Sequence, residues 1–322
     1  MARADFGGQA LMEGVLMRGR GAIGVALRHP DGSIVATSEP LNSILHRSRF
    51  ARAPFFRGLV VLYETLVIGT RWLMRSGSVQ AAGAGQEMGR GTIAFTLLLT
   101  VGLAVGLFVL LPLFIASATT RATLGPGQVL LEHVLEGLIR VLIFVGYLLV
   151  ISRSGEIRRV FQYHGAEHMT ISALEHEDPL NIEHVRRYPT AHQRCGTEFL
   201  VVFIILSIFL FSLLAGQSLV VSIVGRIVLI PVIAAVAYEM LRFGARHRHR
   251  SWIRWLFLPG IWLQGITTQQ PDDSMIEVAI ASMREALAAN GEEAPVGSLD
   301  PQRRPIPTAA EPQEAAPDQL PQ

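Results

Sequence analysis

The sequence contains no lysine, because all 28 of its basic residues are arginine. This absence excludes a lysine Schiff base and phosphate-binding loops that depend on lysine. Cysteine is almost absent too: Cys195 stands alone, so no disulfide can form within the chain. The net charge is only +2, and no basic stripe alternates with aromatic residues, so we expect no nucleic-acid partner.

Charge of either sign is scarce, at 17% of residues, whereas hydrophobic residues make up 50%. This balance is typical of a membrane protein. Several apolar stretches come near the roughly twenty residues that a helix needs to cross a bilayer. The sequence therefore predicts an α-helical integral membrane protein with about four transmembrane helices. They are expected at 92–118, 129–152, 199–215 and 223–241.

The arginines are distributed unevenly between these spans. They gather in 153–194 and again in 242–254, whereas the loop between the first two spans holds only Arg121. Cytoplasmic loops of membrane proteins carry an excess of arginine and lysine. We therefore expect a multi-pass inner (plasma) membrane protein with both termini in the cytoplasm and with membrane lipids as neighbours.

The segment before the first span combines glycine-rich and β-prone stretches. Residues 22–28 and 33–38 flank a Pro-Asp-Gly turn and predict a small β-hairpin, which needs another element to pack against. Glycines between 7 and 21 either let the backbone approach a ligand or form a buried turn. Residues 55–75 predict an interfacial or re-entrant helix because three charges interrupt the apolar pattern, and 76–91 predict a linker.

Two histidines four residues apart, His164 and His168, form the most informative motif, with Glu167 just before the second. In a helix both imidazoles lie on one face and can bind one metal ion, with the carboxylate close enough to hold a water molecule. This is the H-x-x-E-H order of inverted-motif zinc peptidases. The alternative is a pair of core histidines bonded to their neighbours.

A second cluster, His192-Gln193-Arg194-Cys195, precedes the third span. A mixture of histidine and cysteine suits zinc, although a lone cysteine before a membrane helix can also be an inert buried thiol. If His192 and Cys195 both bind, the site has four ligands and is structural; if one binds, a position stays open. Glu175 lies too far along the helix to ligate the same ion, but it can orient an imidazole.

Two charges interrupt the second span, Glu136 and Arg140. They are four residues apart, so they form either a local ion pair or part of a polar path through the bundle. Further along, the basic stretch 246–250 predicts contact with lipid headgroups, and 252–266 predict an interfacial segment. An amphipathic helix is expected at 272–290, followed by a disordered tail.

Several motifs together resemble the YqhQ-like family of bacterial membrane proteins. They are the glycine-rich block 7–19, His-Gly-Ala-Glu-His at 164–168 and Arg-Cys-Gly-Thr at 194–197, with Arg57-Gly58, Glu136-Gly137, Tyr238-Glu239 and Thr267-Thr268 in the same order. The resemblance runs from about residue 6 to 285 and implies a metal-dependent enzyme of unknown reaction. One departure is Gln269-Gln270, where an acidic residue is expected before Pro271.

The sequence thus favours a membrane hydrolase at the cytoplasmic face that uses a divalent metal, with zinc preferred. Metal ligands are expected among His164, His168, His192 and Cys195, with Glu167 as base and Arg194 holding an anionic group. A membrane-associated protein or peptide is slightly favoured as substrate over a lipid. The alternative is a non-enzymatic scaffold or transporter component with a structural His/Cys metal site. The expected segments are 1–90, 91–152, 153–197, 198–243, 244–290 and 291–322.

Overall fold

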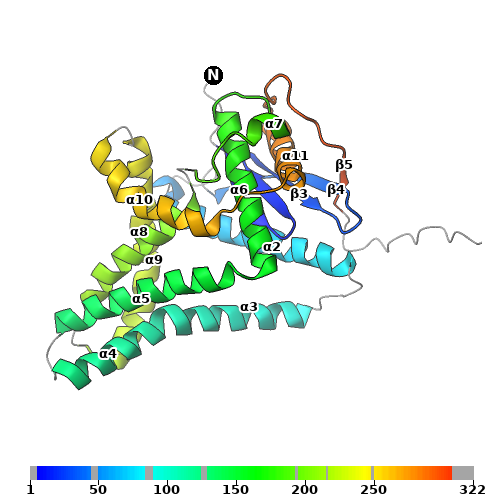
Figure 1. Ribbon diagram of the computed structural model, residues 1–322. Helices are drawn as coiled ribbons and strands as arrows, with labels where there is room; N and C mark the ends of the chain where they lie inside the picture. Colours follow the sequence, from blue (N-terminus) through cyan, green and yellow to red (C-terminus); the bar gives the residue numbers. More distant parts are fainter. Residues whose placement is uncertain are drawn as a thin grey trace, which may run out of the picture.

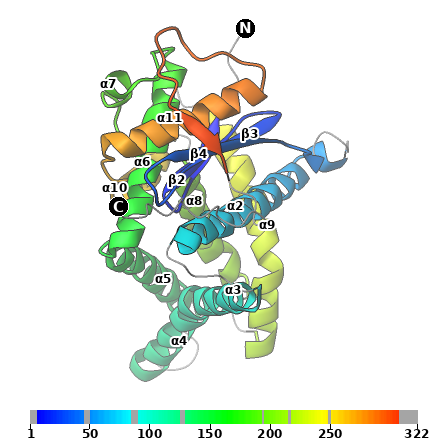
Figure 2. The same ribbon diagram turned by 90° about the vertical axis from the view of Figure 1, so that its right-hand side faces the viewer.

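The computed structural model describes residues 6–44, 50–83, 90–124, 129–192, 195–214, 217–247 and 250–306. A sheet with helices on both faces lies at one end of the molecule, and long apolar helices extend away from it (Figures 1 and 2). Mostly helical architecture with an N-terminal β-region agrees with the sequence prediction. Arg194, one of the predicted site residues, lies outside the described residues.

The sheet has five strands in the order β1-β2-β3-β4-β5. The first four form an antiparallel meander, and β5 pairs with β4 in parallel. The predicted hairpin is present as β3 and β4, but the glycine-rich block adds a second hairpin that was not predicted. The strands are β1 (Gly7–Leu11), β2 (Gly14–Arg18), β3 (Ala22–Arg28), β4 (Ile34–Pro40) and β5 (Arg303–Pro305).

Both faces of the sheet are covered, which explains the nearly continuous apolar sequence of the central strands β2 and β3. Successive side chains alternate between faces, so Val15 and Met17 join one core cluster while Leu16 joins the other. Helices α6 (Gly155–Glu175) and α11 (Asp273–Ala289) cover the first face, and α2 (Phe56–Gly83) covers the second.

The helix expected at 272–290 is present as α11, and it lies in the core of the protein. Ten of its residues are buried against the sheet and α6. Gly24 on β3 permits this packing, because a Cβ there would lie 2.3 Å from the Ala286 nitrogen and 2.4 Å from the Ser282 oxygen. Asp272 caps the helix by accepting a hydrogen bond from the Met275 amide.

Helix α2 continues to Gly83, so the first part of the predicted linker 76–91 is helical. Its charged residues find partners on other elements, which accounts for their interruption of the apolar pattern. Glu64 accepts a hydrogen bond from Arg18 on β2, and the Arg57 Nε donates to Glu239 Oε1 at 2.7 Å. Gly58 lies against the Tyr238 side chain, so two of the recognised sequence blocks meet in space.

Three helical stretches are long and apolar enough to cross a membrane: 94–120, 134–151 and 220–244. The first includes a π-helical turn, η2. The segment predicted as the third span forms the shorter apolar helix α8, of 17 residues. The bounds are α3 (Arg90–Val105), η2 (Gly106–Leu110), α4 (Leu111–Leu124), α5 (Val129–Ile151), α8 (Gly196–Ser212) and α9 (Leu219–Arg246).

The predicted disordered tail is wrong for its first part. Residues 291–306 are described, Leu299 donates a backbone hydrogen bond to Leu180, and β5 extends the sheet. Residues 307–322 lie outside the described part of the chain. The remaining elements are η1 (Phe50–Arg52), α7 (Ile182–Val185) and α10 (Ser251–Thr267).

Candidate metal centre

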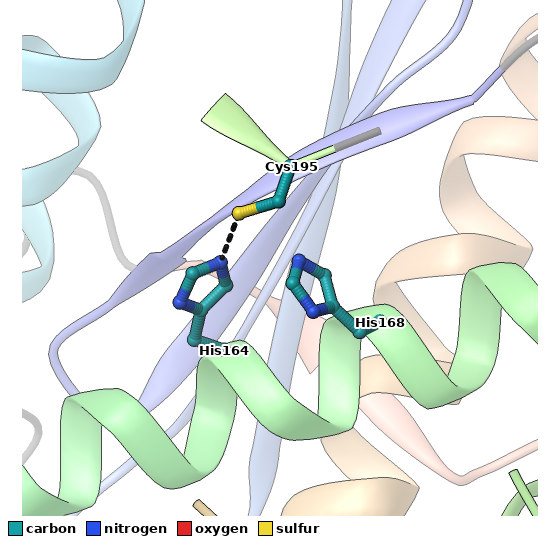
Figure 3. A group of neighbouring side chains, drawn as sticks. All are labelled: His164, His168 and Cys195. Carbon is teal, nitrogen blue, oxygen red and sulfur yellow. Dashed lines mark hydrogen bonds between the residues drawn. The ribbon is translucent and has the colours of Figure 1, made fainter. Parts of the chain in front are cut away.

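The H-x-x-E-H motif lies on helix α6, as predicted. The helix has good helix formers and no proline, and its middle, from Tyr163 to Leu174, is mostly buried. His164 and His168 project from one face with their ring centroids 4.4 Å apart (Figure 3). This is the geometry that spacing of four residues gives on a helix.

Cys195 completes a group of three donors with the two histidines. One ligand atom from each residue lies within 4.8 Å of the others, so the group could hold a metal ion. The Cys195 Sγ is 3.3 Å from the His164 Nε2, and Figure 3 shows the thiol above the two rings. His168 is 2% exposed and Cys195 9%, so the donors are largely withdrawn from solvent.

The far side of each imidazole is held by a backbone carbonyl. His164 Nδ1 is 3.0 Å from the Thr267 oxygen, and His168 Nδ1 is 2.6 Å from the Thr190 oxygen. A carbonyl only accepts hydrogen bonds, so both Nδ1 atoms carry the proton when the rings are neutral. Each Nε2 then keeps its lone pair, as metal-binding histidines supported by outer partners do.

Burial lowers the pKa of His168 and so favours the neutral imidazole that a metal requires. The Cys195 contacts and the Thr190 carbonyl oppose this shift to a smaller extent. The sulfur itself sits at the N-terminus of α8, where Thr197 donates to it from its amide and its hydroxyl at 3.4 and 3.3 Å. A helix N-terminus favours negative charge, which suits a thiolate ligand.

Glu167 is buried next to this group, at 4% exposure. Burial raises its pKa, and the neighbouring His164 and His192 and a hydrogen bond from the Gly8 amide oppose the shift. A Cβ at Gly8 would lie 2.8 Å from Glu167 and 2.7 Å from the Leu16 oxygen. The glycine-rich block therefore brings its backbone into contact with Glu167. The sequence alone had left the role of these glycines open.

Gly165, inside the motif, has a similar role on the other side of α6. A Cβ there would lie only 2.2 Å from the Gln269 carbonyl oxygen. The Gln269 amide donates to Phe161 at 3.0 Å, so this segment runs against the helix through its backbone. That contact places the Thr267 carbonyl on His164, and it needs no acidic side chain at 269 or 270.

His192 lies beside the three-residue group without joining it. Its ring centroid is 5.7 Å from that of His168, and its Nε2 is 3.2 Å from Glu175 Oε2. The expected contact of Glu175 with an imidazole is thus present. Gln264 fixes the His192 backbone, with its side chain accepting from the amide at 2.9 Å and donating to the carbonyl at 3.0 Å. The roles of His192 and Arg194 stay predictions.

These observations define a class of protein with apolar helices long enough to span a bilayer and a largely buried His/His/Cys group beside a sheet. A family model described as "Protein of unknown function (DUF1385)" matches residues 53–289. The chain belongs to this family. It is also 31% identical over 296 residues to "Uncharacterized protein YqhQ" of Bacillus subtilis (strain 168), covering 88% of this chain and 92% of that protein.

No solved structure matches the chain. The family match includes His164, Glu167, His168 and Cys195 but begins after strand β4. The resemblance noticed in the sequence is confirmed at the level of the family. The family's printed description assigns no chemistry, so any activity has to be argued from the site.

Proposed function

We propose that the protein is a metal-dependent hydrolase at the cytoplasmic face of the bacterial inner membrane, with zinc as the preferred ion. The carrying observation is the group formed by His164, His168 and Cys195, whose ligand atoms lie within 4.8 Å of one another beside the buried Glu167. Catalytic zinc sites have three protein ligands and one open position, whereas structural sites have four.

The donors fit zinc by type and by position. Zinc binds imidazole nitrogen at about 2.0–2.1 Å and thiolate at about 2.3 Å. Two such ligands on a tetrahedral ion are roughly 3.5 Å apart, and His164 Nε2 and Cys195 Sγ are 3.3 Å apart. Both imidazoles are already held in the required tautomer by carbonyls, so binding needs little rearrangement of the rings.

When bound, zinc polarises a carbonyl group and makes water a stronger acid. A carboxylate oxygen of Glu167 would accept the proton of the attacking water. Its pKa is raised by burial, which makes it a better base near neutral pH than an exposed carboxylate. The Gly8 amide holds the carboxylate in place, and Arg194 is proposed to hold an anionic group of the substrate.

A peptide or amide bond in a membrane-associated protein is the favoured substrate. The motif order supports this choice over a lipid ester. We propose that α8 also crosses the membrane, which gives four spans together with the three longer stretches. Its 17 residues are at the short end of what crosses a bilayer. The same arginine-rich segments, 153–194 and 242–254, support cytoplasmic termini and a cytoplasmic site.

Elemental analysis of the full-length protein, purified in mild detergent without chelator, tests the metal site. We expect about one zinc per chain, lost in His164→Ala/His168→Ala. The control is His176→Ala/His184→Ala, which removes two described histidines outside the group and should keep the metal. A folded wild type without metal would overturn the proposal.

A hydroxamate probe then separates an open site from a closed one. An open coordination position binds the hydroxamate, whereas four protein ligands leave no room for it. Saturable binding to wild type and to Glu167→Gln, absent in the double histidine variant, supports the enzyme. Metal without hydroxamate binding supports the alternative, a scaffold or transporter component with a structural metal. In cells, Glu167→Gln should then behave as wild type, whereas for an enzyme it should reproduce the gene deletion.

A further inference from the structure

A second buried polar cluster lies among the apolar helices, at Glu136, Arg140 and Arg226. Arg140 NH2 donates to Glu136 Oε1 at 2.5 Å, and Arg226 donates from NH1 and NH2 to both carboxylate oxygens at 2.5 and 2.9 Å. The sequence left open a local pair between Glu136 and Arg140 or a polar path through the bundle. The pairing with Arg226, which comes 90 residues after the glutamate on α9, was not predicted.

The cluster has more positive charge than its partners neutralise. Within the described part of the chain, Glu136 is the carboxylate that forms ion pairs with these two arginines. Two guanidiniums and one carboxylate leave a net charge of +1. Exposures of 2% for Glu136, 5% for Arg140 and 1% for Arg226 place this charge away from water. A bare charge among membrane helices is costly and is normally matched by a counter-charge.

One hydrogen-bond donor of the cluster is also unused. Arg140 employs all of its nitrogens, because Nε donates to the Phe108 carbonyl at 3.0 Å and NH1 donates to the Ser207 hydroxyl at 3.3 Å. Arg226 Nε is buried and, in the described structure, has no hydrogen-bond partner. A buried N–H of a charged group without an acceptor is unfavourable, so the site lacks an acceptor as well as a negative charge.

The surroundings are built to hold guanidinium groups. The Phe211 ring on α8 lies 5.2 Å from the guanidinium carbon of both arginines, a cation–π distance. Phe108 lies in the π-helical turn η2, and the residue four positions further on is Pro112, which has no N–H to donate, so the Phe108 carbonyl can accept from Arg140. π-Helical turns within α-helices often occur at functional sites.

The cluster lies well inside the helical bundle and away from the metal centre. Glu136 and Arg226 each follow the first residue of their helix by seven positions, which is about 10 Å along the axis. Cys195, which caps α8, belongs to the metal centre, and Ser207 on α8 contacts the arginine cluster. The two residues are about 18 Å apart along the helix axis. The two sites can therefore be tested separately.

We propose that Arg140 and Arg226 form an intramembrane binding site for an oxyanion of net negative charge, such as inorganic phosphate or the phosphodiester of an anionic lipid headgroup. An oxygen of the anion would accept the Arg226 Nε proton and neutralise the surplus charge, since guanidinium groups pair strongly with such oxyanions. Lipid headgroups and free phosphate share this chemistry. The proposal depends on the apolar helices and not on the metal or on hydrolysis.

Ligand binding by the full-length protein in non-ionic detergent tests this site. Short-chain phosphatidylglycerol, phosphatidylcholine of equal chain length and inorganic phosphate are titrated while thermal unfolding is followed by circular dichroism. We expect wild type to bind phosphatidylglycerol, phosphate or both at least about tenfold more tightly than phosphatidylcholine. Phosphatidylglycerol alone indicates a lipid headgroup, and added stabilisation by phosphate indicates a site reached by free anions.

Three variants locate the binding. Arg226→Gln removes the surplus charge and should abolish the preference for the anion. Glu136→Gln raises the surplus to +2 and should strengthen it at least about threefold. Arg153→Gln removes an exposed arginine just after α5 and should change nothing.

Two outcomes would overturn the proposal. One is a wild type that does not prefer either anion over phosphatidylcholine. The other is a folded Arg226→Gln protein that keeps the full preference. If Arg226→Gln does not fold, Arg140→Gln decides the question, because it also removes the surplus charge and leaves the Arg226–Glu136 pair in place. A full preference for the anion in Arg140→Gln contradicts an anion site at this cluster.

Discussion

The two buried polar clusters of this protein have opposite chemistry. The His164/His168/Cys195 group turns lone pairs towards one another, so it is suited to a cation. The Glu136/Arg140/Arg226 cluster has more N–H groups and positive charge than acceptors, so it is suited to an anion. Their supports differ as well. Backbone carbonyls orient the histidines, whereas a single side chain, Glu136, joins the two arginines.

This difference predicts how each cluster fails. A backbone-supported cluster should tolerate many side-chain changes nearby but not a change that pushes the backbone away. A cluster joined by one carboxylate should fail when that carboxylate is removed.

Glu136→Gln should destabilise the protein strongly in anion-free detergent. It leaves two buried guanidiniums facing one another, and breaking a buried pair in this way costs about 3–5 kcal/mol. Arg226→Gln should cost less, about 1–3 kcal/mol, because a neutral Glu136–Arg140 pair remains. Denaturant unfolding followed by circular dichroism measures both. An equal cost, or a larger cost for Arg226→Gln, would show that the cluster carries no surplus charge.

The sequence predicted one of these clusters far better than the other. Two of the three candidate ligands, His164 and His168, lie on one helix, so local spacing placed them together correctly. The arginine cluster depends on α5 and α9 packing side by side with α8, and Arg226 joins Glu136 across 90 residues. No local pattern encodes that pairing, although a charge inside each of two apolar spans was a usable signal.

The sheet shows the same limit. The Pro-Asp-Gly turn identified β3 and β4 because a turn is a local feature. Strands β1 and β2 were read only as a glycine-rich block, and β5 as part of a tail, because their pairing depends on distant partners. Gly8 and Gly165 were visible in the sequence, but only the approach of Glu167 and of the Gln269 carbonyl explains them.

Gly165→Ala tests the backbone support of the histidines. The new methyl group would overlap the Gln269 carbonyl oxygen, 2.2 Å away, and should lower the free energy of unfolding by about 3 kcal/mol. It should also lower the metal content, because the Thr267 carbonyl would move away from His164. Gly155→Ala on the same helix is the matched control. Nothing lies within 4 Å of its Cβ position, so it should be neutral or stabilise by less than about 1 kcal/mol. Matching results for the two variants would mean that this contact does not support the site.

Gly8→Ala tests the contact between the sheet and Glu167, and its expected effect is the smallest. The methyl group would press on the Leu16 carbonyl and on the Glu167 side chain, but the latter can shift, so we expect a cost of about 1–2 kcal/mol. Metal content should stay at the wild-type level, because none of the three proposed ligands is on β1.

The adjacent Gly7→Ala is the control for that variant, since nothing lies within 4 Å of its Cβ position. Denaturant unfolding and elemental analysis of both proteins give the two readouts. If Gly8→Ala loses stability but keeps its metal, and Gly7→Ala matches the wild type in both readouts, then strand β1 supports Glu167 and not the metal ligands. If Gly8→Ala instead loses its metal, the sheet supports the ligands themselves. The metal site would then depend on more of the fold than the arginine cluster does.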